Sequence, residues 1–151
     1  MKKAILLTVF VSIVVAATLL GACSSGPQPT AENPVPGKAV KSAPIGDGLM
    51  VTISSETGKL KGGEQEIFLS FTDPSGKAVD VGMVKAAALN FRMPAMGSMS
   101  EMNSSASFTT TSVPGVYMGK VDIEMKGEWQ AQISFEGDKG KGQTTMSVTA
   151  Q

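Results

Sequence analysis

The sequence predicts an all-β fold, an immunoglobulin-like antiparallel β-sandwich of about seven strands, and three observations support it. Apolar and polar residues alternate in several short segments, as expected for strands with one buried face. Turn sequences that contain Gly and Pro separate these segments. No long helix is predicted beyond the N-terminal region. The Cys and Trp signature of true immunoglobulin domains is missing, so the predicted likeness is architectural.

The alternation predicts the strands in order along the chain. The predicted segments are 49–53, 67–72, 79–83, 87–93, 106–110, 117–125, 129–135 and 146–150. Turns are expected at 73–76 and 114–115, where Pro is followed by Gly. Pro94 should end the strand before it, because proline has no N–H to donate to a neighbouring strand. Met93 and Met125 fall on inward faces, which predicts that both belong to the core.

Residues 1–22 have the layout of a secretory signal peptide, with a basic start followed by an apolar run. Leu20-Gly21-Ala22-Cys23 resembles a bacterial lipobox, which implies cleavage before Cys23 and acylation of that residue. The alternative is an uncleaved transmembrane anchor, because the apolar run approaches the roughly 18 residues that can span a bilayer. The cysteine directly after two small residues favours the lipoprotein. The domain is then expected outside the cytoplasm, on the periplasmic side of the outer membrane if the cell has two membranes.

The chain after the predicted signal peptide is expected to consist of a linker followed by one domain. Residues 23–47 contain Pro27, Pro29, Pro34, Pro36 and Pro44 and no sustained apolar period, which is typical of a flexible linker. Residues 48–151 are long enough for a single domain with one core.

The composition narrows the possible functions. Removal of residues 1–22 deletes two of the 13 basic residues and none of the 13 acidic ones, so the mature charge is 11 minus 13, or −2. This charge does not favour nucleic-acid binding. The chain has no histidine, and its single cysteine is Cys23, which excludes imidazole-dependent catalysis and most zinc sites. A hydrolase that uses Asp122 and Glu124 is a weak alternative, because a solvated strand face explains both residues. We expect a protein that is not an enzyme.

The most distinctive segment contains four methionines at every third position. They are Met93, Met96, Met99 and Met102. This spacing fits neither a strand nor a helical stripe, so a loop is expected after Pro94. Thioethers are neutral, soft donors that favour Cu(I), and a curved loop could turn two or three of them toward one ion. Met118 lies where alternation predicts solvent, and Trp129 is a candidate to stack on the cation.

The same methionines have a second interpretation. Methionine also fills gaps in cores and forms adaptable contact surfaces. The loop, with an exposed Phe68 or Met118, could therefore dock an envelope partner without any metal. The sequence alone leaves Cu(I) binding and metal-free docking both open.

Three segments of the chain resemble the YtkA-like domain, to which FixH-type extracytoplasmic domains are related. They are Met93-Pro94-Ala95-Met96-Gly97, Pro114-Gly115-Val116-Tyr117 and Met125-Lys126-Gly127-Glu128-Trp129. The resemblance covers about residues 48–150 and implies an extracytoplasmic β-sandwich, and it does not imply an enzyme. It also implies an association with copper handling, in which copper-efflux or respiratory-oxidase components would be partners. Some copper carriers with a similar loop add a histidine ligand, which this chain lacks.

Overall fold

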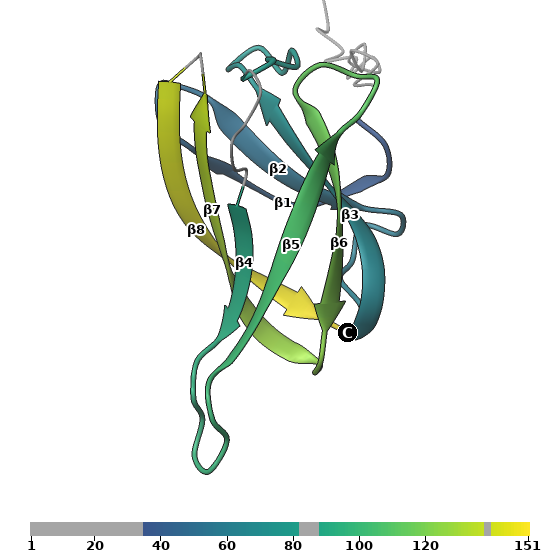
Figure 1. Ribbon diagram of the computed structural model, residues 1–151, viewed down its shortest axis with the longest axis vertical. Helices are drawn as coiled ribbons and strands as arrows, with labels where there is room; N and C mark the ends of the chain where they lie inside the picture. Colours follow the sequence, from purple (N-terminus) through teal and green to yellow (C-terminus); the bar gives the residue numbers. More distant parts are fainter. Residues whose placement is uncertain (1–34, 82–87, 138–139) are drawn as a thin grey trace, which may run out of the picture.

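The structure is a computed structural model that describes residues 35–81, 88–137 and 140–151 (Figure 1). Eight strands form in these ranges: β1 (Lys38–Pro44), β2 (Met50–Ser55), β3 (Gly63–Thr72), β4 (Ala88–Met93), β5 (Met102–Thr110), β6 (Val116–Ile123), β7 (Gly127–Gly137) and β8 (Gly140–Ala150). No helix in the described ranges has the length and apolar character needed to cross a membrane. The predicted signal peptide, Cys23 and Met83 lie outside the described residues.

The strands form one antiparallel sheet that curves until its two ends almost meet. Its order is β1-β2-β3-β6-β5-β4-β7-β8, and every pairing between neighbours is antiparallel. Two hydrogen bonds join the residue after β8 to the segment between β2 and β3: Gln151 N donates to Leu60 O at 2.9 Å, and Gly62 N donates to Gln151 O at 3.3 Å. The predicted all-β, antiparallel fold is therefore confirmed, as a nearly closed sheet with eight strands where about seven were expected.

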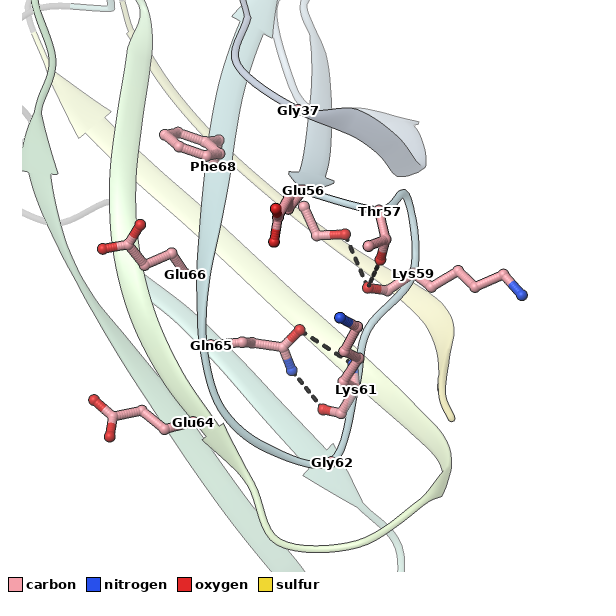
Figure 2. A pocket seen from close by; sticks show the side chains of 11 residues that line it. Gly37, Glu56, Thr57, Lys59, Lys61, Gly62, Glu64, Gln65, Glu66 and Phe68 are labelled. Atoms are coloured by element: carbon pink, nitrogen blue, oxygen red, sulfur yellow. Dashed lines mark hydrogen bonds between the residues drawn. The ribbon is translucent and has the colours of Figure 1, made fainter.

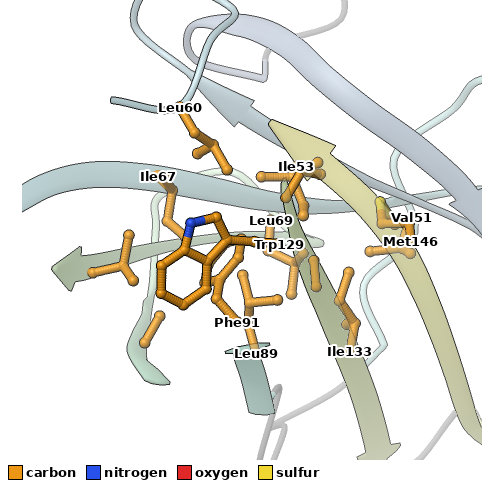
Figure 3. Close-up of a cluster of buried hydrophobic side chains, with 14 of the residues drawn as sticks. Val51, Ile53, Leu60, Ile67, Leu69, Leu89, Phe91, Trp129, Ile133 and Met146 are labelled. Atoms are coloured by element: carbon orange, nitrogen blue, oxygen red, sulfur yellow. The ribbon is translucent and has the colours of Figure 1, made fainter. Parts of the chain in front are cut away.

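The core fills the inside of this curved sheet (Figure 3). Trp129 is completely buried among aliphatic side chains from both halves of the sheet, and Leu60, Ile67, Leu69, Leu89 and Phe91 surround it. Among the described residues, the buried core side chains lie between Ile45 and Ala150. The chain after Cys23 therefore contains the entire described core.

β1 corrects the predicted boundary of the linker. Lys38–Pro44 pairs with β2 along its length, although the sequence placed it in the linker 23–47. The register shifts between Ala39 and Lys41, so Val40 and Ala43 become the partly buried positions packed against the core. Because of this bulge, the inward-facing residues are three positions apart and not two. The alternation that would reveal a strand is therefore absent from this part of the sequence.

Two further expectations for this part of the chain were wrong. Residues 79–81 form no strand, and only a bridge between Thr72 and Ala78 follows the 73–76 turn. The backbone of Gly115 packs directly against the carbonyl group of Val79, and that of Gly137 packs against the carbonyl group of Val81. This segment is therefore held by close backbone contacts and not by pairing within the sheet.

Met125 was the second wrong prediction, since it is not a core residue. β6 ends at Ile123, and the Met125 side chain is 38% exposed in the turn before β7. The indole Nε1 of Trp129 donates to Met125 O at 3.0 Å, which holds the turn and ends the alternation there.

Candidate metal site in the methionine arm

Residues 93–102 form a hairpin that we call the methionine arm. It continues β4 and β5 past the end of the sheet and projects away from the body of the molecule (Figure 1). Met93 pairs with Met102 at its base, and Met96 pairs with Met99 near its tip. Residues 94–101 lie outside the strands, as expected for a loop, and the isolated bridge between Met96 and Met99 keeps the register of the pair Met93 and Met102.

A two-residue turn closes the tip of the arm. Met96 N donates to Met99 O at 3.2 Å, and Met99 N donates to Met96 O at 2.9 Å. Gly97, with φ 58, takes the first central position of this turn, and Ser98 takes the second. A positive φ at the first central position alone is the geometry of a type II′ turn, which favours Gly there. Met-Gly-Ser-Met is therefore a local signal for the pairing of the two methionines.

Met96 and Met99 are direct cross-strand neighbours. Because they exchange both backbone hydrogen bonds, their Cα atoms lie about 5.5 Å apart and their side chains leave the ribbon on the same face. Their side chains are 55% and 39% exposed. Two flexible thioethers on one face can bring their sulfurs to one soft cation.

Met93 and Met102 occupy a different environment. Met93 is only 2% exposed, and Met102 is partly buried and packs against the core. Each lies three positions along the chain from the nearest methionine of the tip pair, which is about 10 Å along a strand. An odd separation also reverses the face of a regular ribbon. The register therefore divides the four methionines into a base pair and a tip pair, and it does not gather them around one point.

The remaining candidates of the predicted metal site lie away from the tip. Met118 is half-buried on β6 and pairs with Phe68 and Thr109. Thr109 is seven residues along β5 from Met102, or about 23 Å. Trp129 is fully buried in the core, so its indole is not on the arm.

Polar side chains brace the base of the arm on its outer face. Arg92 Nη2 donates to Glu101 Oε2 at 2.6 Å, and Asn103 Nδ2 donates to Glu101 Oε1 at 3.0 Å. These two hydrogen bonds, with that from Arg92 the stronger cause, lower the pKa of the Glu101 carboxyl below its usual value. The sequence pattern gives no sign of this ion pair, because Arg92 and Glu101 are diagonal neighbours that meet only in the observed register.

Acidic side chains do not form a second candidate site in the described ranges. No group of three or more His, Cys, Asp or Glu residues there is placed to hold a metal. Asp122 is exposed on β6, and Glu124 is exposed in the turn that follows.

A groove of about 550 Å³ lies beside β3 and includes Phe68 in its wall (Figure 2). Gln65 closes one side of it by a pair of hydrogen bonds to the Lys61 backbone. The Lys59 and Glu64 side chains point to opposite sides of it.

One of three comparisons with known proteins identifies a family. Searches among curated proteins and among solved structures found no match. The sequence profile of the YtkA-like family matches residues 46–134, which is more than half of the chain. The matched range runs from the turn before β2 into β7 and includes the whole methionine arm. The chain therefore belongs to the YtkA-like family.

Proposed function

We propose that this chain is an extracytoplasmic lipoprotein, anchored to a membrane through Cys23, that binds Cu(I) with Met96 and Met99 and passes it on. It catalyses no reaction. Copper-efflux or respiratory-oxidase components would receive or supply the ion. The observation that carries the proposal is the exposed pair of thioethers, facing the same way at the tip of the methionine arm.

The chemistry of the arm supports a soft monovalent cation. Thioethers favour Cu(I) over hard divalent ions, and they need no deprotonation before they bind. Of the residues between Met96 and Met99, Gly97 has no side chain and Ser98 offers only a hard hydroxyl donor. The chain has no histidine, the usual ligand for Cu(II). A site of this kind binds with moderate affinity and releases its ion readily.

The test is competition for Cu(I) against a chromophoric chelator under anaerobic conditions. The chain from Ser24 to Gln151 should withdraw Cu(I) from the chelator, and the variant M96L/M99L should not, because leucine keeps the volume and removes both sulfurs. M125L is the matched control, since Met125 is as exposed as Met99 but lies outside the arm. If the unmodified chain shows no competition, or if M96L/M99L competes equally well, Cu(I) binding at the tip is wrong.

The anchor has its own test. Acyl chains on Cys23 would hold the protein at the membrane, because each buried methylene contributes about 0.8 kcal/mol. We expect the mature protein in the membrane fraction, with an N-terminal peptide whose mass includes the lipid. Cys23→Ala should leave an unprocessed precursor without that added mass. An unlipidated Cys23 in a processed wild-type chain would contradict the proposal.

A second candidate function is a metal-free interaction module. It is favoured by the cross-strand pair Phe68 and Met118, which places two large apolar side chains on the outer face of the sheet beside the groove. Replacement of Met118 by Leu should preserve capture of an envelope partner, whereas Met118→Lys should abolish it. Capture that depends on Met96 and Met99 being sulfur-containing, and not only apolar, would instead support the metal-binding function.

A further inference from the structure

We propose that two copies of this chain share one Cu(I), each contributing the sulfurs of Met96 and Met99 from the tip of its methionine arm. This inference rests on the proposed function, because it names the partner that completes the same site. It follows from the small number of soft donors that one arm offers.

A single tip supplies two suitable donors. Met93 is 2% exposed, and Met102 packs against the core about 10 Å along the strand from Met99. The hydroxyl groups of Ser98 and Ser100 are hard donors, which Cu(I) does not favour. The carboxylate of Glu101 is already bound by Arg92.

Two neutral thioethers leave the coordination sphere of Cu(I) half open. A thioether adds no charge attraction, so a stable site made only of thioethers requires three or four of them. The tip projects beyond the sheet, and no labelled strand of the body lies beside it in Figure 1. Among the described residues no further soft donor lies beside the tip, and we infer that a second chain supplies the missing donors.

A second copy is suited to supply them. Residues 94–100 contain no charged side chain, and the nearest charges, Arg92 and Glu101, pair with each other. Two tips can therefore approach without electrostatic repulsion. Gly97 and Ser98 add little bulk at the turn, and a hairpin presents its two methionines with near two-fold symmetry. These properties suit an isologous contact in which the ion lies on the symmetry axis.

The stoichiometry of metal binding tests this inference. Residues 24–151 would be titrated with Cu(I) under anaerobic conditions, and with Ag(I) as a redox-inert probe, while the mass is followed by sedimentation. We expect an endpoint of one ion for two chains and a twofold rise in mass that chelator reverses. One ion bound per monomer would overturn the shared site and leave Cu(I) binding intact. No binding of either ion would overturn both proposals.

Two variants separate the shared site from a general loss of structure. M96L/M99L should lose the metal-dependent dimer, whereas M125L should keep it. Ser98→Asp retains all four sulfurs but places a negative charge on each tip, where repulsion between copies opposes attraction for the cation. We expect Ser98→Asp to remain monomeric and to bind Cu(I) more weakly than the unmodified chain. Unchanged or tighter binding by monomeric Ser98→Asp would show that one chain is sufficient and would overturn the inference.

Discussion

The base pair and the tip pair of the methionine arm place the same residue type in opposite environments. Met93 is buried, and its Cε is the nearest atom to a Cβ built on Gly127 at the start of β7. Met96 lies three residues further along the chain and is 55% exposed. The comparison shows that distance from the body and the face of the ribbon, not the motif, decide which methionines stabilise the fold and which remain available to a ligand.

The two pairs should differ most in how far their side chains stabilise the fold. Met93→Ala should lower the free energy of unfolding by about 2–5 kcal/mol, because it removes a packed core side chain and leaves a cavity. Met96→Ala should change it by less than about 0.5 kcal/mol, because the side chain is exposed. Urea unfolding followed by Trp129 fluorescence measures both. Equal losses of stability in the two variants would contradict the division into a base pair and a tip pair.

Alkaline pH should act on the body and not on the arm. Tyr117 lies on β6, and burial, together with the negative charge of Asp80, raises the pKa of its hydroxyl to about 12. Because the folded pKa is raised, the associated stability is complete below the unfolded pKa of about 10 and is lost as the pH rises toward 12. The full loss is about 2–3 kcal/mol.

Tyr117→Phe provides the control, since it has no group to titrate. The unfolding free energy of the wild type should fall relative to that of this variant as the pH is raised from about 9 to about 12. Protection of the Met96 and Met99 amides from hydrogen exchange should fall at alkaline pH only to the extent that the whole body unfolds. A constant difference between the two proteins would show that Tyr117 titrates normally.

Sequence alternation identified most of the fold because each strand buries one face. It located the cores of β2, β3 and β7 correctly, and it predicted the burial of Met93. It failed at β1, where the bulge near Val40 changes the spacing of inward residues from two to three. It also failed at Met125, because a turn held by Trp129 ends β6 before the apolar pattern ends.

The candidate site was predictable in its residue types but not in its geometry. The threefold spacing identified the methionines, yet the division into two pairs depends on a register centred on the Gly97–Ser98 turn. Gly at the first central position was a usable signal for that turn. The bond between Arg92 and Glu101 had no such local signal, because it joins two strands diagonally.

The tip pair can be disrupted without damage to the body by changing Gly97. Gly97→Val forces a β-branched residue into a left-handed conformation, at a cost of about 1–2 kcal/mol. That is comparable to the two backbone hydrogen bonds between Met96 and Met99, at about 1 kcal/mol each. We expect the tip to open, the Met96 and Met99 amides to lose protection from exchange, and Cu(I) competition to weaken.

Gly76→Val is the matched control for this change. Gly76 has φ 84 in a turn outside the arm, and a Cβ added at either glycine meets no atom within 4 Å. The strain is therefore similar, but the methionines are not involved. Weakened Cu(I) competition in both variants would indicate a general effect on the fold, and not a requirement for the tip pair.

The smallest effect is expected at the brace between Arg92 and Glu101, under acid conditions. Because the folded pKa of Glu101 is lowered, its contribution to arm stability is present above about pH 4.5 and is lost as the pH falls through the lowered value. The group is exposed, so the loss should appear as a lower protection factor of the Met99 amide and not as unfolding of the body. Glu101→Gln keeps one of the two acceptor oxygens, which can serve Arg92, and it does not titrate, so its arm should respond less to acid. Thioethers do not titrate in this range, so a fall in Cu(I) binding between about pH 6 and pH 3 that is larger in the wild type than in the Glu101→Gln variant would come from loss of the brace. An equal fall in the Glu101→Gln variant would show that the bond between Arg92 and Glu101 does not cause the pH dependence.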